Sequence, residues 1–479
     1  MALLPSVFML ESGSRYLNLT KNVPASLPYG FLKFDEEQIW SPRVRFAAEP
    51  AKTGDGQFVH IRSLYNNKYL VKTQIEETKS WIFVASAKKT EEDPSKDSCT
   101  LFEPFSLKDD EPTSVRLRHV HKTKSFVNVS ASSSEGDAQQ GLLASSSNES
   151  VFRITDAADI VFLPSKVAIL SNDHILESKL IHGENCQQFI PGSESDLANP
   201  EAAKELFRTP KGMYLIMDMN WLQYLTLRAE GWILADSQPS NTSPNCVFTF
   251  VQIEDNIFGI RSEGYGNHFF CGARSVSEEK KNCLSSYYPT LTYQTRLTVV
   301  ERVLKREITD IVYRLSDARV YGEQPTEVDV QTTTNLLSKS TTKSTLTFTE
   351  SNTRTSTWSN SQTINFGVSV SMTVATVPFI SEGKIKLDAG FTKTHKWDET
   401  ESTKVSRGTT HSVTVPPLKT YMVTLMATTG VCDVPFNYTQ RDLLTTGEWV
   451  ETKNKDDGLF KGINSYNFYY DQVEKKVDS

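Results

Sequence analysis

The chain has 479 residues and a formal net charge of −7 at pH 7. This length allows about three domains of ordinary size. A hydrophobic content of 38% with 10% aromatic residues excludes a wholly disordered chain. The acidic balance excludes the basic surface that nucleic acid or anionic lipid would need, so we expect no nucleic-acid partner.

The N-terminal residues make a poor signal peptide, because they have no basic start and contain Pro5 and Glu11. No stretch holds the run of about 18 apolar residues that a transmembrane helix needs. We therefore expect a soluble, cytoplasmic form. Its six cysteines are expected to stay reduced.

Signals for catalysis or metal binding are weak. His268, Cys271 and Cys283 could suggest zinc, but they lack a CxxC pair, and a structural role is favoured. The chain has no G-x-S-x-G, HExxH, P-loop or Rossmann motif. The acidic run at residues 91–93 is better explained as solvated surface than as a glycosidase site. We predict no enzymatic activity, no metal and no cofactor.

Three stretches near the N-terminus share alternating apolar residues around a polar turn, at residues 8–19, 59–71 and 115–129. This pattern is typical of β-hairpins. The spacing of roughly 50 residues indicates a repeated supersecondary unit. Three similar hairpin units favour a β-trefoil.

A longer repeat follows. Residues 68–104 are echoed by residues 223–250, with Trp81 and Trp232 at equivalent positions. The chain is therefore predicted to carry two copies of one domain.

We place the first β-trefoil at residues 1–157, the second at 158–303 and a different module at 304–479. Residues 196–207 suggest a short helix between strands of the second copy.

Carbohydrate sites combine an aromatic ring, which stacks on the sugar, with a few polar groups for its hydroxyls. Such residue types gather on predicted hairpin turns, where side chains can stay exposed. The candidates are Asn66, Asn67, Tyr69, His119 and His121 in the first copy, and Asn220, Trp221 and Tyr224 in the second.

Some of these positions also fit a structural role. Tyr69 and Tyr224 occupy equivalent repeat positions, where packing in the trefoil core is favoured. The same holds for the two repeated tryptophans. Asn66, Asn67 and Trp221 are expected to be exposed.

Residues 67–69, 98–104 and 282–284 resemble the corresponding motifs of plant amaranthin-type lectins, and the resemblance extends over residues 1–303. It implies two tandem β-trefoil agglutinin domains that bind galactose or N-acetylgalactosamine glycans. In that family the sites lie between the first domain of one subunit and the second domain of another. Leu70 stands where the family has a Trp near the sugar, which leaves the glycan open.

The C-terminal module is rich in Ser and Thr from about residue 328 to 415. This composition favours long amphipathic β-strands over a helical fold. A disordered low-complexity tract is the alternative. Embedded apolar alternation, together with Trp358 and Trp397, argues against it.

Residues 363–392 predict a hairpin built to enter a membrane, because each arm alternates strictly and has about the 9–11 residues of a transmembrane strand. The predicted membrane-facing residues are Ile364, Phe366, Val368, Val370, Met372, Val374, Val377, Phe379, Ile380, Ile385, Leu387 and Phe391. The predicted lumen-facing residues are Ser369, Ser371, Thr373, Lys384, Lys386 and Asp388. Val377, Phe379 and Ile380 are expected at the tip.

An ordinary hairpin packed on a sandwich core would show the same alternation. The apolar turn and the polar flanking strands favour the membrane interpretation. A bilayer leaves no backbone group unpaired, so several chains must join their hairpins into a closed barrel. Homo-oligomerisation is therefore part of the prediction.

Residues 366–369, 382–384 and 412–425 resemble aerolysin-type pore-forming modules, and the resemblance covers residues 307–479. It implies a hairpin stored against the soluble body that unrolls once receptor-bound subunits form a ring. The whole chain is thus predicted to be a lectin-headed pore-forming protein, acting in plant defence. The alternative is a multivalent lectin whose C-terminal module only oligomerises or spaces the heads.

Overall fold

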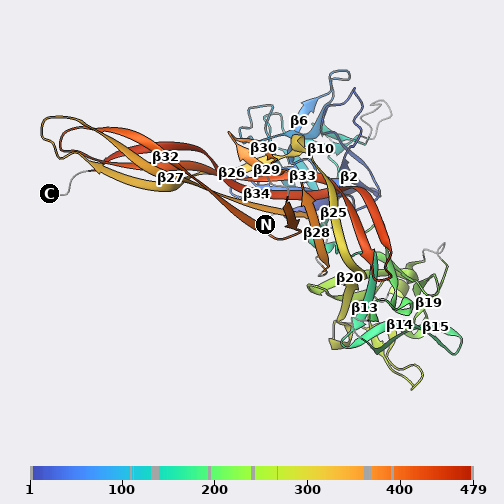
Figure 1. Ribbon diagram of the computed structural model, residues 1–479. Coiled ribbons are helices and arrows are strands. Elements are labelled where there is room, and N and C mark those ends of the chain that lie inside the picture. The colour runs from blue at the N-terminus through green and yellow to red at the C-terminus, as the bar shows by residue number, and fades with distance from the viewer. Residues whose placement is uncertain are drawn as a thin grey trace. The chain divides into compact units, whose positions relative to one another are not determined.

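The computed structural model in Figure 1 describes residues 4–475 apart from 108–110, 112, 131–139, 148, 193–195, 239–242, 267, 361–365, 367 and 390–392. Within these residues the regular elements are β-strands and short 3-10 turns. The all-β prediction is confirmed. The chain forms two compact units, unit 1 with residues 1–306, 362–369 and 441–451, and unit 2 with residues 307–361, 370–440 and 452–479.

The first sheet of unit 1 has twelve strands among the described residues. They are β1 (Val7–Ser12), β2 (Arg15–Leu19), β3 (Leu32–Glu36), β4 (Phe46–Pro50), β5 (Val59–Ser63), β6 (Lys68–Gln74), β7 (Trp81–Ala87), β8 (Leu101–Phe105), β9 (Ser114–His119), β10 (Ser125–Val129), β11 (Leu142–Ser145) and β12 (Phe152–Asp156). The three predicted hairpins are the pairs β1–β2, β5–β6 and β9–β10. Turns η1 (Pro42–Val44) and η3 (Ala157–Asp159) accompany this sheet.

The second sheet repeats the same strand count over the described residues. Its strands are β13 (Lys166–Ser171), β14 (His174–Ile181), β15 (Glu184–Pro191), β16 (Lys204–Arg208), β17 (Tyr214–Asp218), β18 (Gln223–Leu227), β19 (Ile233–Ser237), β20 (Val247–Glu254), β21 (Ile257–Ser262), β22 (Phe270–Arg274), β23 (Cys283–Tyr288) and β24 (Leu297–Glu301). Its 3-10 turns are η5 (Pro200–Ala202), η6 (Ala229–Gly231), η7 (Pro244–Cys246), η8 (Gly264–Gly266) and η9 (Tyr293–Thr295). Two tandem β-trefoils thus occupy unit 1.

The short helix expected at residues 196–207 is not formed. Pro200–Ala202 make a 3-10 turn capped by the Asn199 side chain, and the chain enters β16 at Lys204. Leu206 points into the trefoil core while Glu205 does not, as strand alternation requires. The helix-forming composition was overridden by sheet pairing with β13 and β17.

Each trefoil buries its own apolar core, and the two are joined by a shared cluster within unit 1. Trp40 of the first trefoil donates its indole N–H to the Thr209 carbonyl at 2.6 Å. The Arg208 guanidinium lies 5.0 Å from the Trp40 ring centroid. Lys211 forms an ion pair with Glu11. These contacts make the two trefoils one compact body.

The strands of unit 2, some of which begin or end in unit 1, include the longest of the described chain (Figure 1). They are β25 (Val303–Tyr313), β26 (Arg319–Thr334), β27 (Thr342–Asn360), β28 (Ser369–Val374), β29 (Val377–Ser381), β30 (Lys384–Asp388), β31 (Lys393–Lys396), β32 (Glu401–Val415), β33 (Thr420–Leu444) and β34 (Trp449–Lys475), with the turn η10 (Leu315–Asp317). Eight of these strands share one sheet among the described residues, and β29 and β30 form a separate pair.

Strands β27 and β32 pair without interruption from Thr342 opposite Val415 to Ser356 opposite Glu401, and we call this pairing the long ladder. Ser and Thr fill most of its positions, so most of its side chains are exposed or half-buried. Phe348 and Val413 are among its few buried residues. The Ser/Thr-rich tract is therefore ordered strand, and the disordered alternative is wrong.

Candidate functional site

Asn66 and Asn67, two sugar-site candidates, are buried, with 1% and 3% of their surfaces exposed. The Asn66 side chain donates to the Ala85 carbonyl at 2.9 Å, and Arg62 donates to the Asn67 side chain at 2.9 Å. Asn67 has a φ of 54°, which Asn tolerates in a tight turn. The expectation that these two residues are exposed is wrong, because they build the β5–β6 turn.

His119 is also a core residue. Its ring lies between Phe83 and Phe102, with centroids 5.3 and 5.2 Å away, and its Nε2 is 2.9 Å from the Cys99 carbonyl. Burial lowers the pKa of His119 to about 4. A neutral, fully enclosed imidazole does not reach a ligand at the surface.

Tyr69 and Tyr224 divide between two environments. Tyr69 is half-buried and donates its hydroxyl to Glu49 at 2.6 Å, whereas Tyr224 is buried beside Phe207. Asn220 is exposed, and Trp221 is half-buried against the trefoil core. The indole N–H of Trp221 has no hydrogen-bond partner among the described residues. Asn220 is thus the candidate of this group that is most open to solvent.

Trp81 was expected in the core but is 38% exposed, whereas its repeat partner Trp232 is 8% exposed. The Lys72 ammonium lies 4.8 Å from the Trp81 ring centroid and donates to Ser125 at 3.2 Å. Burial lowers the pKa of Lys72, and the charge of Asp97 opposes this shift.

His121 lies beside this group, with its Nε2 3.5 Å from the Asp97 carboxylate. We call Lys72, Trp81, Asp97, His121 and Ser125 the Trp81 surface. It offers an exposed ring beside ammonium and carboxylate groups, which is chemistry that suits a sugar. His121 is the sequence candidate that joins it.

The second trefoil has a pocket of about 390 Å³ lined by Tyr265, Tyr287, Arg228 and Glu230. Tyr265 and Tyr287 are 61% and 54% exposed. At its rim Arg228 pairs with Asp236, whose other carboxylate oxygen is buried and has no hydrogen-bond partner in the described chain.

We call this site the Tyr265 pocket. Sequence reasoning missed it because its residues come from three separate segments, η6, η8 and β23. Two exposed rings with a donor and an acceptor at one opening again fit a saccharide.

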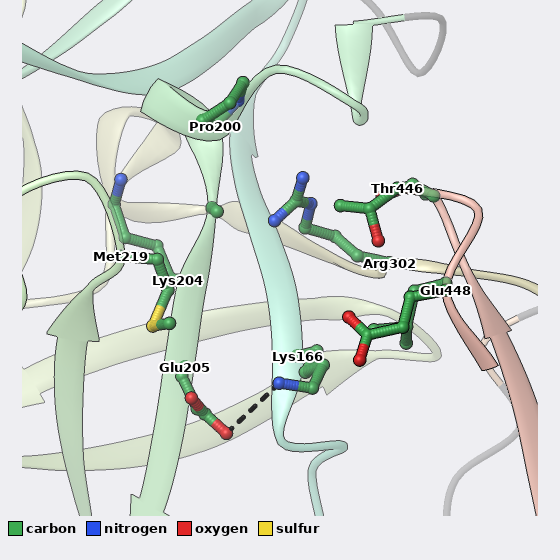
Figure 2. A pocket seen from close by; sticks show the side chains of 11 residues that line it. Lys166, Pro200, Lys204, Glu205, Met219, Arg302, Thr446 and Glu448 are labelled. Carbon is green, nitrogen blue, oxygen red and sulfur yellow. Dashed lines mark hydrogen bonds and ion pairs between the residues drawn. The ribbon is translucent and has the colours of Figure 1, made fainter. Parts of the chain in front are cut away.

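A smaller pocket of about 250 Å³, shown in Figure 2, lies against β13 and β16. Four of its five charged side chains, those of Lys166, Lys204, Glu205 and Arg302, contact other groups of the chain. Lys166 pairs with Glu205 at 3.4 Å, and Arg302 donates to the Leu197 carbonyl at 2.6 Å. Lys204 is fully buried 3.1 Å from a carboxylate oxygen of Asp218, and burial lowers the pKa of this lysine. We assign this pocket to packing.

Within the predicted membrane hairpin, residues 363–392, the described residues 370–389 belong to unit 2. We call the strands β28 to β31 the stored hairpin. Strand β28 pairs with β31 and β29 pairs with β30. The turn between β29 and β30 is Glu382–Gly383, and both residues have positive φ. The predicted apolar turn is wrong for this state, because Val377, Phe379 and Ile380 lie in β29.

The stored hairpin hides its apolar side chains and exposes its charged ones. Met372, Val374 and Ile380 are buried in the unit 2 core, and Lys384 and Lys386 are exposed. Of the predicted lumen residues, Ser369 and Thr373 are exposed, and Ser371 and Asp388 are half-buried. On the membrane-facing list, Val370, Val377, Phe379 and Ile385 are half-buried and Leu387 is exposed. Ile364 and Phe391 lie outside the described residues.

Two further membrane-face candidates, Phe366 and Val368, belong to unit 1 and are half-buried. Phe366 stacks on Phe258 of the second trefoil at a centroid distance of 6.3 Å.

A few polar contacts hold the stored hairpin. The Asn464 side chain donates to the Ile380 carbonyl and accepts from the Ile380 amide, both at 2.8 Å. Arg354 donates to Asp388 at 2.9 Å, and its guanidinium lies 4.5 Å from the Phe379 ring centroid. These contacts hold residues 379–388, which belong to the segment whose alternation predicts membrane entry. Each hydrogen bond of this kind contributes little to stability, so the hairpin can be released.

The backbone between β28 and β29 is held by one further contact. The Tyr313 hydroxyl donates to the Thr376 carbonyl at 3.1 Å and accepts from the Trp358 indole at 3.0 Å. Burial raises the pKa of Tyr313.

No group of metal-ligating side chains occurs among the described residues. Cys271 and Cys283 are buried, unpaired thiols, and the other four cysteines are buried and unpaired too. In the described part of the chain, no helix has the length and apolar content to cross a bilayer.

Protein-family models match both ends of the chain. An agglutinin-domain model matches residues 2–148. A model described as Clostridium epsilon toxin ETX/Bacillus mosquitocidal toxin MTX2 matches residues 289–467. Among curated proteins, none matched the chain.

Solved structures that match part of the chain include a mosquitocidal holotoxin, at 10% identity and TM-score 0.28 over 65% of this chain and 36% of the holotoxin. The chain thus spans about a third of that protein's length. A lamprey immune protein matches at 15% identity and TM-score 0.29, over 66% of this chain and 93% of its own. An aerolysin-like protein from Bombina maxima matches at 9% identity and TM-score 0.25, over 36% and 99%.

Proposed function

The chain carries an N-terminal agglutinin domain and a C-terminal aerolysin-like toxin domain of the ETX/MTX2 type, and we propose that it is a glycan-binding pore-forming protein. The lectin head attaches the soluble protein to carbohydrate on a cell surface. Bound subunits then oligomerise, and their hairpins form one transmembrane β-barrel.

Carbohydrate recognition is proposed for two places on the head, the Trp81 surface and the Tyr265 pocket. Both pair exposed aromatic rings with polar groups. Galactose and N-acetylgalactosamine glycans are the first ligands to test, on the basis of the amaranthin resemblance. Leu70, which replaces the family Trp, is buried and faces the core. A ring elsewhere must therefore carry the stacking.

One observation carries the pore proposal above the others. In the sequence, a hairpin with alternating apolar residues lies between the two strands of the long ladder. Three of these apolar residues, Met372, Val374 and Ile380, are buried in the core of unit 2. Opening the hairpin exposes all three together. Exposed apolar strands in water are unstable, and a bilayer accepts them only in a closed barrel. Subunit assembly therefore belongs to the mechanism.

The setting of this activity is also a proposal. A cytoplasmic protein that meets foreign or damaged membranes only after wounding fits a role in plant defence, as the lectin resemblance implies.

The experiment is dye release from liposomes that carry galactose-headed glycolipid, with matched liposomes lacking it. A glycan-dependent pore former releases dye from the first set and spares the second. The competing function is a multivalent lectin, whose linked heads raise avidity without a pore. That protein would aggregate the glycolipid liposomes and leave their dye inside.

A further inference from the structure

The stored hairpin and the long ladder have different pairing registers. In the long ladder each step forward along β27 is one step back along β32, from Thr342–Val415 to Ser356–Glu401. The stored hairpin sits between these strands in sequence but does not continue their pairing. Its register places Val377 opposite Asp388, with the turn at Glu382–Gly383.

The stored register does not suit a bilayer. It places the apolar Phe379 opposite Lys386 and Val377 opposite Asp388. Met372 lies opposite His395. Val374 likewise lies opposite Lys393. Paired residues of neighbouring strands point to the same face of a sheet. In β29 and β30 one face is therefore mixed, while the other pairs Ile380 with Ile385 and Pro378 with Leu387. In β28 and β31 the basic side chain of His395 shares a face with the apolar Met372 and Val374.

Continuing the register of the long ladder separates the two kinds of side chain. On one face the ladder's one-for-one pairing would place Val368 opposite Ala389, Val370 opposite Leu387 and Met372 opposite Ile385. On the other face it would place Ser369 opposite Asp388, Ser371 opposite Lys386 and Thr373 opposite Lys384. At these six pairs the first face is apolar and the second polar.

The same continuation puts Val377 opposite Ile380, which leaves Pro378 and Phe379 as the two turn residues. Pro has no N–H to donate, and every strand of a closed barrel is paired on both sides. In the stored register Pro378 lies inside β29, opposite Leu387. A barrel tolerates this proline better in the turn, where the missing N–H of Pro378 leaves no gap in the pairing between strands.

We propose that, in the membrane, the hairpin adopts the register of the long ladder, so that its turn moves from Glu382–Gly383 to Pro378–Phe379. The lipid-facing surface that this creates consists of Val368, Val370, Met372, Ile385, Leu387 and Ala389. This inference rests on the proposed pore function and adds the residue pairing of the barrel.

The conversion is a sliding of one arm along the other. The partner of Val377 changes from Asp388 to Ile380, a shift of eight residues. At about 3.4 Å per residue the arms move by about 27 Å. The shift is an even number of residues, so each side chain keeps its side of the arm. The contacts of Asn464 with Ile380 and of Arg354 with Asp388 must break first.

Paired cysteines report the register directly, because a disulfide forms only between Cα atoms within about 7 Å. The variant V370C/L387C tests the proposed register, and F379C/K386C tests the stored one. Each is oxidised in solution and on glycolipid liposomes, then digested with trypsin. Cleavage at Lys384 separates the two arms in both variants, so a disulfide-linked peptide pair is identified by mass spectrometry. The four variants that carry one introduced cysteine each are the controls.

We expect F379C/K386C to link in solution and V370C/L387C to link only on liposomes. Oxidising F379C/K386C before it meets the liposomes should abolish dye release, and reduction should restore it. Release of dye by the wild-type protein, with the two cysteines of F379C/K386C linked in the membrane form and those of V370C/L387C never linked, would contradict the proposed register and leave the proposed pore function intact. If the wild-type protein releases no dye, the proposed function fails and the register proposal fails with it.

Discussion

Asn464 holds Ile380 by both its backbone groups, with hydrogen bonds of 2.8 Å to the Ile380 amide and carbonyl. Both residues are buried, so neither group finds water when the amide side chain is removed. This pair fixes the strand of the stored hairpin that must slide for a barrel to form. The first prediction concerns its removal.

Asn464→Ala should destabilise the stored hairpin by about 2 kcal/mol, since two buried backbone groups lose their partners. Hydrogen exchange at residues 377–388 should become faster, and dye release should begin at a lower protein concentration. Asn352→Ala is the matched control. Asn352 also makes two hydrogen bonds, to Ser465, and does not contact the hairpin. An equal effect of the two substitutions on hairpin exchange would contradict the role of Asn464.

Arg354 and Asp388 should show a measurable coupling. Their ion pair is partly exposed, so a double-mutant cycle with Arg354→Gln and Asp388→Asn should give about 0.5–1 kcal/mol in the free energy of unfolding. The coupling should shrink at high salt. Both single variants should release dye faster than the wild type. Slower release from either variant would show that the pair acts in the pore and not as a latch.

The buried His119 predicts an acid sensitivity of the first trefoil. In the unfolded chain the imidazole of His119 has a pKa near 6.5, and burial lowers this pKa to about 4 in the folded chain. The free energy of unfolding should therefore fall by roughly 3 kcal/mol as the pH drops through this range. His119→Gln should flatten the dependence. His182→Gln, at an exposed histidine, is the control and should leave the slope unchanged. An unaltered slope in the His119 variant would exclude this residue as its source.

The Tyr265 pocket makes a separate prediction about sugar binding. Tyr265→Asn removes the ring while keeping a residue that tolerates the φ of 54° at this position. Loss of a stacking ring should weaken glycan binding by about tenfold. Tyr293→Asn is the control, since Tyr293 is exposed and does not line the pocket. A glycan array and titration calorimetry measure the effect. Equal binding by all three proteins would place the sugar site elsewhere.

The two faces of the hairpin should respond differently to the same substitution. Val370→Lys places a charge toward lipid. Near the bilayer midplane this costs about 2–4 kcal/mol per chain, so dye release should be lost. Ser371→Lys adds the same charge on the opposite face. This variant should still release dye and should shift ion selectivity toward anions. Tolerance of lysine at Val370 with loss at Ser371 would reverse the assignment of the faces.

The repeated hairpins were predictable from sequence because local alternation sets strand pairing. The hairpin predicted at residues 8–19 agrees with the observed pairing of Glu11 with Tyr16. The agglutinin model matches the first predicted copy, and the ETX/MTX2 model matches most of the C-terminal module.

Side-chain exposure was less predictable, because it depends on what a neighbouring strand places above each residue. Trp81 and Trp232 occupy equivalent positions, yet two cations, Arg274 and Lys280, lie over the Trp232 ring and Lys72 lies over the Trp81 ring. Asn67 was selected as a sugar ligand for its turn position, and the turn itself is what requires Asn. The stored register could not be predicted from the sequence pattern, because it depends on distant partners such as Asn464, which lies 84 residues from Ile380 in the chain.

The most direct measurement of the central claim is the ionic current across a planar bilayer that contains galactose-headed glycolipid. The account predicts discrete, stepwise current increases after the protein is added, and none for Val370→Lys or for bilayers without glycolipid. Protein that binds and cross-links the glycolipid while the current stays at baseline would contradict the account, and would leave a multivalent lectin in its place.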